Sequence, residues 1–271
     1  MMNFASQELN EWRESQNYYE FSSPNSEEKS KIKADSVKLF ADKLRVPTVS
    51  ELLTRPRLIE HLAKSLTQFS ATLVVGRAGT GKTDLAADFA RLNDFCVAWY
   101  KVETADSDWK TFSSYLLGSI KQNCGENFNE KAFDEVEVPV MTESLAARFA
   151  DAAEDKPLLI VLDDLHSIFD ADWFTDFFTN FVSSLSPNVH LLMIARTAPP
   201  LPLWRLRSKQ VLGVMDEKLL TFTLDETLEL FRKYNLPATA ARSAHKLSYG
   251  KIAKLAEIIE KKSGKSNRIL V

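Results

Sequence analysis

Apolar and polar positions alternate along the chain in two rhythms, which predict strands and helices in turn. Short apolar runs bounded by turn residues are typical of strands buried on both faces of a parallel sheet. They lie at residues 73–75, 95–102, 158–162, 189–196 and 210–215. The stretches between them repeat apolar residues every three to four positions, as helices do. This alternation predicts an α/β fold with a doubly wound parallel sheet.

The predicted helices differ in what their apolar faces contain. The first places Leu58, His61, Leu62 and Leu66 on one face. Residues 123–139 are irregular and acidic and predict a surface insertion, so the next helix is expected to begin near residue 142. A helix over residues 172–185 carries five aromatic side chains, which we interpret as core packing and not as a cofactor site.

The pattern becomes helical only from about residue 217. Thr223 and Glu226 form a capping box before further helical spacing, and the last helix is expected over residues 251–262. We therefore divide the chain into a polar N-terminal arm (1–43), a nucleotide-binding domain (44–216) and a small helical domain (217–271). The arm is either disordered or docked on a partner or on its own core, because it is polar but contains several aromatic residues.

One loop in this pattern is a complete phosphate-binding motif, with Gly76, four residues and then Gly81-Lys82-Thr83. The glycines let backbone N–H groups face a polyphosphate, and the next helix adds its N-terminal partial charge. Lys82 is expected on the β- and γ-phosphates, and the Thr83 hydroxyl on Mg²⁺. The expected nucleotide-binding residues are Gly76, Arg77, Ala78, Gly79, Thr80, Gly81, Lys82, Thr83 and Asp84.

Two acids end the apolar run at 158–162, at the edge where open α/β sheets bind ligands. Asp163 is a candidate Mg²⁺ ligand, and Asp164 a candidate for orienting or deprotonating an attacking water. Taken alone, the pair is equally compatible with two solvated carboxylates. Arg196 follows a strand that should neighbour the phosphate-loop strand, so it is a candidate sensor of the terminal phosphate, with an ordinary ion pair as the alternative.

Composition and charge limit the classes of partner and the cellular location that can be expected for the chain. The 271 residues include 34 basic and 37 acidic side chains, for a net charge of −3. This balance gives no global basic field, so no direct nucleic-acid binding is expected. Cys96 and Cys124 have no metal-ligand spacing and are interpreted as buried or free thiols in a reducing cytosol. The start of the chain lacks a signal-peptide pattern, and no apolar run is long enough to span a bilayer, so a cytoplasmic location is expected.

Several motifs occur together in an order that resembles one family. They include Arg55-Pro-Arg-Leu, the phosphate loop, Leu162-Asp-Asp-Leu-His, a segment beginning Ile194-Ala-Arg-Thr, and Leu220-Thr-Phe-Thr. Together they resemble the nucleotide-binding module of the STAND ATPases, in the branch of the maltose-regulon activator and large LuxR-type regulators. The resemblance covers roughly residues 44–262. It implies a P-loop NTPase fold of the ASCE type and an ATP/ADP switch with slow hydrolysis and Mg²⁺ that acts in signal transduction and transcription regulation.

The sequence departs from that family plan in two places. It has no winged-helix, repeat or helix-turn-helix region after the helical domain, and it has Gly250-Lys-Ile where the family often has Gly-x-Pro. We therefore expect either a regulatory switch whose output lies in a protein partner or in self-association, or a fragment of a longer regulator. Two alternatives stay open: a ring ATPase that does mechanical work, and a scaffold that binds nucleotide without hydrolysing it.

Overall fold

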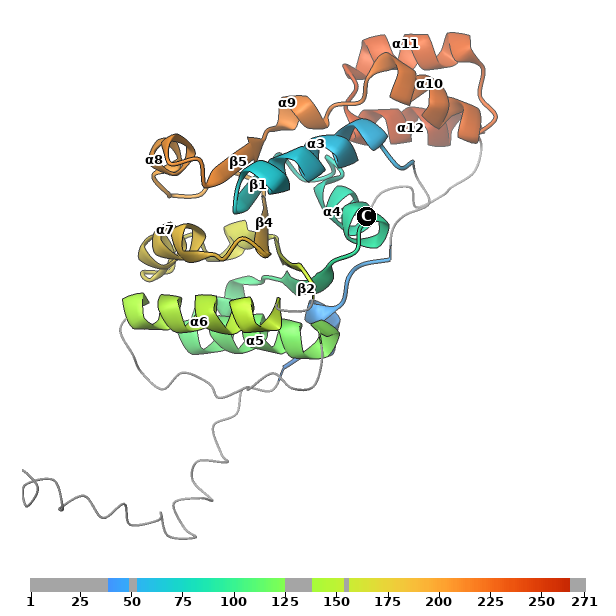
Figure 1. Ribbon diagram of the computed structural model, residues 1–271. Helices are drawn as coiled ribbons and strands as arrows, with labels where there is room; N and C mark the ends of the chain where they lie inside the picture. Colours follow the sequence, from blue (N-terminus) through green and yellow to red (C-terminus); the bar gives the residue numbers. More distant parts are fainter. Residues whose placement is uncertain (1–38, 49–52, 125–137, 154–155, 264–271) are drawn as a thin grey trace, which may run out of the picture. The chain divides into compact units, whose positions relative to one another are not determined.

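The computed structural model describes residues 39–48, 53–124, 138–153 and 156–263, which all lie in one contact unit beginning at Leu39 (Figure 1). Most of the predicted N-terminal arm lies outside the described residues. Its last residues contain a 3₁₀ turn, η1 (Ala41–Leu44), in which Lys43 Nζ lies 2.8 Å from Asp106 Oδ1 and 2.9 Å from Glu103 Oε2. The division of the chain into three parts stays a prediction.

Five strands form one sheet: β1 (Ala71–Val75), β2 (Cys96–Lys101), β3 (Leu158–Asp163), β4 (Val189–Ala195) and β5 (Leu212–Met215). Their order is β2-β3-β4-β1-β5, and every neighbouring pair is parallel. Val75 lies opposite Ala195, and Lys101 lies opposite Asp163. The predicted doubly wound parallel sheet is therefore confirmed, and β3 lies two strands from β1.

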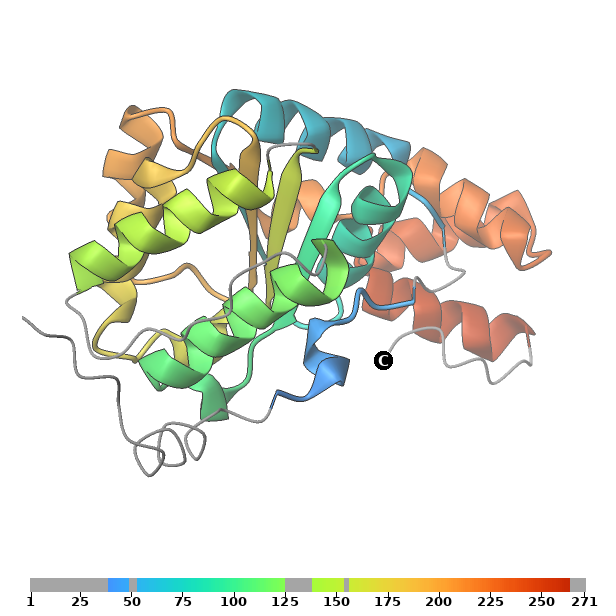
Figure 2. The same cartoon turned by 60° about the horizontal axis from the view of Figure 1, so that its bottom comes forward.

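Successive strand residues feed two separate hydrophobic cores, because side chains alternate between the faces of a sheet. On β3, Leu158, Ile160 and Leu162 enter one core, whereas Leu159 and Val161 enter the other. The first core is covered by α5 (Trp109–Cys124), α6 (Val138–Ala152), α7 (Phe174–Ser184) and α8 (Leu203–Ser208), and the second by α3 (Pro56–Gln68) and α4 (Lys82–Leu92). In Figure 2 the green helices α5 and α6 cross in front of the strands.

The aromatic stripe of α7 packs in the core, as its spacing predicted. Phe177 lies 4.8 Å from the ring of Trp109 and 5.0 Å from that of Phe181, and both phenylalanines are fully buried. Trp173, just before α7, joins the same cluster at 5.1 Å from Trp109. Such aromatic pairs add packing energy beyond their buried area. None of these aromatic side chains lines the pockets beside the phosphate loop described below, which agrees with a role in core packing.

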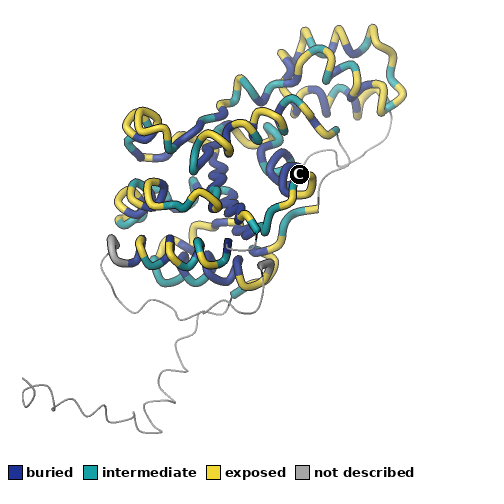
Figure 3. Tube along the Cα trace, viewed as in Figure 1, coloured by how far each residue is buried: buried dark blue, intermediate teal, exposed yellow. Residues whose placement is uncertain are grey.

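The last four helices are called the helical segment below; the last three share a third core, whereas Leu219 and Leu220 of the first pack in the second core beside the sheet. The four helices are α9 (Glu217–Leu220), α10 (Leu224–Lys233), α11 (Ala238–Ser248) and α12 (Ile252–Ser263). Their third core includes Phe222, Phe231, Leu255 and Ile259, and Figure 3 shows the buried stripe between these helices. The capping box at Thr223 forms as predicted, with Thr223 Oγ1 accepting from the Glu226 N–H at 3.2 Å.

Three local expectations differ from the structure. α6 begins at Val138, earlier than the residue 142 start that was expected; most of the acidic insertion at 123–139 lies outside the described residues. His61 is exposed, because α3 turns Ser65 toward the sheet together with Leu58 and Leu62 and keeps the imidazole in solvent. Cys96 is disulfide-bonded, so the expectation of a free thiol there is wrong.

Candidate functional site

Three strand ends create the site, because parallel strands present their carboxyl ends at the same edge of the sheet. β1 leads into the phosphate loop, β3 ends at Asp163, and β4 ends immediately before Arg196. The Gly76 N–H donates to the Ala195 carbonyl at 3.2 Å, which ties the start of the loop to the end of β4. The five side chains given catalytic or metal roles therefore converge on one edge, although those roles stay predictions.

The loop after β1 has the backbone shape needed to surround a phosphate. Gly79 and Gly81 adopt φ angles of 72° and 78°, a region that glycine enters freely because it lacks Cβ. Gly76 is constrained by packing, since a Cβ there would lie 3.2 Å from Thr80 Oγ1. α4 begins at Lys82, directly after this turn, so the positive end of its dipole lies at the loop.

Lys82 is held in place before any ligand arrives. Its ammonium donates to the carbonyl oxygens of Gly76 at 2.6 Å and Arg77 at 2.8 Å, and the residue is only 8% exposed. Burial lowers the pKa of Lys82, and the nearby Asp164 and Asp163 carboxylates oppose that shift. A fixed cation in partly buried surroundings is suited to a phosphate, because no side-chain ordering is left to be done on binding.

Thr83 and Asp163 form the candidate metal site. The Thr83 hydroxyl lies 3.1 Å from each carboxylate oxygen of Asp163, and the Asp164 N–H donates to Asp163 Oδ1 at 3.0 Å. Asp163 is 3% exposed; burial and the neighbouring Asp164 charge raise its pKa to about 6. A hydroxyl beside a buried carboxylate fits the oxygen preference of Mg²⁺, which takes one or two protein ligands and completes its shell with phosphate and water.

Asp164 lies on the solvent side of this pair. Its backbone has a positive φ of 56°, an uncommon conformation for a non-glycine residue. The carboxylate lies 3.9 Å from Arg196 Nε and 3.8 Å from His166 Nδ1. The Arg196 side chain is 53% exposed and therefore has room to reorient toward a ligand. The strand before Arg196 pairs with the phosphate-loop strand, as was predicted.

His166 lies close to the acidic pair, and the sequence pattern gave little weight to this position. Its Nδ1 is buried and has no hydrogen-bond partner among the described residues. Burial lowers its pKa, and Asp164 opposes this effect while Arg196 and Lys82 add to it. The sequence signal was its position two residues after the acidic pair, which the short 3₁₀ turn η3 (Leu165–Ile168) folds back toward the site.

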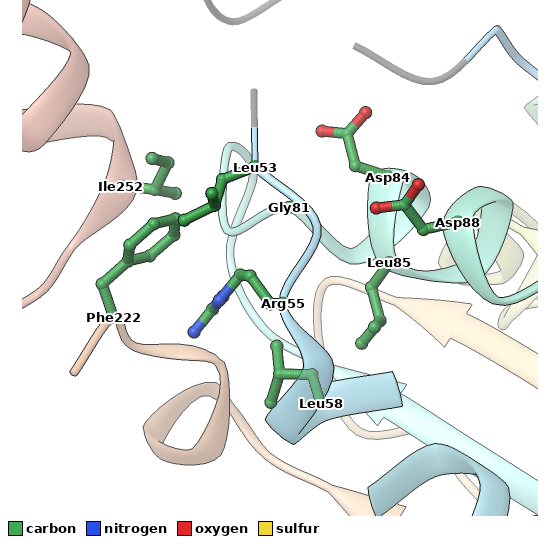
Figure 4. A pocket seen from close by; sticks show the side chains of 9 residues that line it. All are labelled: Leu53, Arg55, Leu58, Gly81, Asp84, Leu85, Asp88, Phe222 and Ile252. Atoms are coloured by element: carbon green, nitrogen blue, oxygen red, sulfur yellow. The ribbon is translucent and has the colours of Figure 1, made fainter. Parts of the chain in front are cut away.

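A pocket lies beside the loop and is walled partly by the helical segment (Figure 4). The Arg55 guanidinium lies 4.1 Å from the centre of the Phe222 ring. Apolar walls with a few charged groups are typical of small-molecule sites. Asp84 lines this pocket, whereas Arg77 and Ala78 line a second pocket, which shares Ile252 with the first. The lining residues are Leu53, Arg55, Leu58, Gly81, Asp84, Leu85, Asp88, Phe222 and Ile252.

Comparison with known proteins agrees with this geometry. Residues 51–194 match the family model of the AAA ATPase domain. The chain is 29% identical over 197 residues to the HTH-type transcriptional regulator MalT of Serratia proteamaculans (strain 568), a match that covers 71% of this chain and 22% of that protein. The chain therefore spans about a fifth of the length of that regulator.

Two solved structures share the fold. A Signal Transduction ATPase with Numerous Domains (STAND) with a tetratricopeptide repeat sensor, from Pyrococcus horikoshii, matches with a TM-score of 0.55 and 17% identity, over 79% of this chain and 30% of that one. A chain of the Drosophila ORC bound to DNA matches with a TM-score of 0.50 and 12% identity, over 96% of this chain and 68% of that one. The resemblance to a STAND-class P-loop ATPase related to MalT is confirmed.

Proposed function

This chain belongs to the AAA ATPase domain family, and from that premise we propose that it is a regulatory switch that binds ATP and ADP with Mg²⁺ and hydrolyses ATP slowly. The observation that carries the proposal is the contact of the Thr83 hydroxyl with the Asp163 carboxylate at 3.1 Å, beside a Lys82 already held by the loop. Phosphate-binding and metal-binding groups from distant parts of the chain meet there, as nucleotide hydrolysis requires.

Each residue has a distinct proposed role. Lys82 neutralises the β- and γ-phosphates, and Thr83 and Asp163 would hold Mg²⁺, which supplies charge neutralisation across those phosphates. Asp164 accepts a proton from water as the water oxygen bonds to the terminal phosphorus and the bridging P–O bond breaks. Arg196, beside Asp164, would contact the terminal phosphate and report its hydrolysis. We propose that the nucleotide base occupies the pocket lined by Phe222 and Ile252, so that the helical segment contacts the ligand.

The output of the switch is proposed to be a protein partner or self-association, because nucleotide states act on an equilibrium between conformations. Among the described residues no helix is long and apolar enough to cross a membrane. Cytoplasmic location remains part of the proposal, without the cysteine argument that the Cys96 disulfide removes. The Drosophila ORC that shares the fold is bound to DNA. Our expectation of no direct nucleic-acid contact is therefore tested by a binding measurement with duplex DNA in Mg-ATP, in which we expect no association.

A thermal-shift titration tests the core of the proposal. Mg-ATP and Mg-ADP should each raise the unfolding temperature of the wild-type protein. At a hundredfold excess over the dissociation constant, each ligand should add about 2.7 kcal/mol to the free energy of unfolding. Lys82→Ala should abolish this stabilisation, whereas Lys64→Ala, an exposed lysine on α3, should keep it. Full stabilisation of Lys82→Ala by ATP would show that the site is assigned wrongly. A wild-type turnover well above about one per second without partners would favour the ring ATPase.

A further inference from the structure

An open groove lies at the end of the sheet opposite to the phosphate loop. It is lined by residues at the end of α3, in α8 and at the start of β5, among them Phe69, Trp204, Arg207 and Leu212. Leu212 lies opposite Ala71, the first residue of β1, whereas the phosphate loop follows the other end of that strand. The groove therefore takes no part in the proposed nucleotide chemistry.

Trp204 presents a large apolar surface to solvent at this groove. It is 75% exposed, although it stands only two residues before the buried Leu206 in α8. Because Leu206 packs in the first core, the indole is not needed to hold α8 on the sheet. The half-buried Phe69 and the buried Leu212 add apolar walls to the groove. Exposed tryptophan beside apolar walls is typical of a surface that binds a partner, since aromatic anchors contribute most to such interfaces.

The groove is locally cationic, although the chain as a whole has a net charge of −3. Arg205, Arg207 and Lys209 are exposed, and their side chains form no ion pair within the described part of the chain. The two segments that supply the walls, residues 61–83 and 197–215, contain no aspartate or glutamate. Cations without partners beside an exposed indole attract an acidic ligand.

The small extent of this cationic surface favours a peptide over a nucleic acid. All three cations lie within residues 205–209, which form little more than one helical turn, so they contact only a few charges in succession. Proteins that bind nucleic acids neutralise many successive phosphates, and the net negative charge of this chain repels such a polyanion. A peptide with a few acidic side chains near one apolar side chain matches both the charge and the apolar walls.

We propose that the groove around Trp204, between α3 and α8, binds an acidic segment of a partner protein that carries an aromatic or large aliphatic anchor residue. The anchor packs against Trp204 and Phe69. Its acidic neighbours pair with Arg205, Arg207 and Lys209. This site does not depend on the nucleotide site, and it adds to the proposed switch a surface on which a partner is bound.

Selection from a random peptide library displayed on phage tests the groove on the full chain. Peptides are retained on the wild-type protein, and those that also bind the double variant Trp204→Ala/Arg207→Glu are removed. Both side chains are exposed, so the double variant should unfold at the wild-type temperature. The remaining peptides should combine several Asp or Glu residues with one aromatic or large aliphatic residue. Peptides without acidic residues, or none that distinguish the two proteins, would overturn the proposal.

Calorimetry with one selected peptide measures the separate contributions. Trp204→Ala and Arg207→Glu should each weaken binding at least about tenfold, and added salt should weaken it further because exposed charge pairs are screened. Leu247→Ala and Arg242→Glu change exposed residues of α11 and are the matched controls, which should stay within about twofold of the wild type. Lys82→Ala should also bind the peptide normally, so failure of the nucleotide site and failure of the groove are told apart.

Three results would assign the groove to a different occupant and overturn the proposal. Competition between a single-stranded oligothymidylate and the peptide would indicate a nucleic-acid site. Loss of self-association in Arg207→Glu, measured by sedimentation velocity without peptide, would indicate a second copy of the chain. A carbodiimide cross-link from Lys209 to an acidic residue of the same chain, displaced by the peptide, would indicate an internal segment.

Discussion

The Asp163 carboxylate is subject to two opposing effects, one that requires it to be ionised and one that disfavours its ionisation. A metal ligand must be ionised, yet this carboxylate is 3% exposed and its pKa is raised to about 6 by burial and by the charge of Asp164. Near neutral pH the folded protein therefore carries a buried negative charge, whose cost is only partly offset by a hydrogen bond from Thr83 and another from the Asp164 N–H. Strain of this electrostatic kind is expected at functional sites.

Asp163→Asn should therefore make the protein more stable without ligand. A carboxyl pKa that rises from 3.8 in the unfolded chain to about 6 in the fold lowers the free energy of unfolding by roughly 3 kcal/mol above pH 6. We expect Asp163→Asn to recover about 2 kcal/mol of this in chemical denaturation at pH 7.5. The gain should shrink as the pH falls below 6 and disappear well below pH 3.8, where the wild-type carboxyl is protonated in both states.

The same variant should lose the Mg²⁺-dependent part of its nucleotide affinity, measured by calorimetry with and without the metal. Asp172→Asn, an exposed change near α7, is the control and should alter neither property. A variant that is less stable than the wild type at pH 7.5 would contradict the assignment of a buried, unfavourable charge at residue 163.

Asp164 should affect chemistry and leave binding largely intact. Its carboxylate lies outside the Thr83–Asp163 contact but next to Arg196. Asp164→Asn keeps the size of the side chain and removes proton acceptance, so ATP turnover should fall by at least about a hundredfold. Nucleotide affinity should stay within about threefold, because the loop and Lys82 are unchanged. Phosphate release measures the first effect and calorimetry the second; unchanged turnover would support the non-hydrolysing scaffold.

Among single residues, the sequence predicted those that follow a strand end and missed those that reach the site through contacts between distant parts of the chain. Lys82, Thr83 and Asp163 follow local motifs whose geometry is set within a few residues. Arg55 and Phe222 meet only because the helical segment folds back across more than 160 residues, as the hydrogen bond from Arg55 Nη1 to the Leu220 carbonyl shows. No local pattern of hydrophobic or charged residues encodes such a contact.

At the scale of elements, the turn between α11 and α12 packs closely against the backbone of Phe222 within the helical segment. Gly250 has a φ of 72°, and its carbonyl accepts from the Phe222 N–H at 2.8 Å. A Cβ at this position would lie 2.2 Å from the Phe222 carbonyl oxygen. Tyr249, the preceding residue, also has a positive φ of 54° but is 80% exposed. Neighbouring residues thus share a backbone conformation and differ in the space around them.

Gly250→Ala should displace α12 from the loop, because a clash with backbone atoms adds to the conformational strain. We expect a loss of more than about 2 kcal/mol of stability and a weaker affinity for nucleotide, since Ile252 lines the proposed base pocket. Tyr249→Gly relieves the same strain in open surroundings and should be neutral or slightly stabilising. Thermal unfolding with and without Mg-ADP compares the two; equal stability of both variants would show that the close contact is not tight.

Element boundaries were predicted best where a strand is buried on both faces. β3 and β4 match the runs expected for them to within one residue at each end, because strands covered by helices on both faces are built mainly from apolar side chains. α6 was placed too late, since Val138 and Pro139 stand in its first turn and proline is tolerated there. His61 was assigned to a buried face because spacing alone cannot tell which of two overlapping helical stripes meets the sheet.

Across the whole molecule, the Glu226 carboxylate joins the helical segment to the α/β part. Glu226 caps α10 through the Thr223 N–H and also pairs with Arg55 and Arg57 on either side of Pro56, at the start of α3. Burial would raise the pKa of Glu226, but its hydrogen bonds with both arginines outweigh this and hold the pKa below its usual value. The contribution of this cluster to stability is therefore present above pH 4.5 and is lost as the pH falls through the lowered pKa.

Glu226→Ala tests whether the helical segment and the α/β part unfold together. The Glu226 and Arg55 side chains are 11% and 9% exposed, so removing the carboxylate leaves a buried cation without its partner and should cost about 3 kcal/mol. Because the segment has its own core, calorimetry should show a second transition at lower temperature, with the β-sheet transition little changed. Glu229→Ala on the same helix should keep a single transition. A single transition in Glu226→Ala would mean that the remaining contacts, such as the hydrogen bonds from Arg55 and Arg57 to the carbonyls of residues 219–221, are enough to unite the molecule.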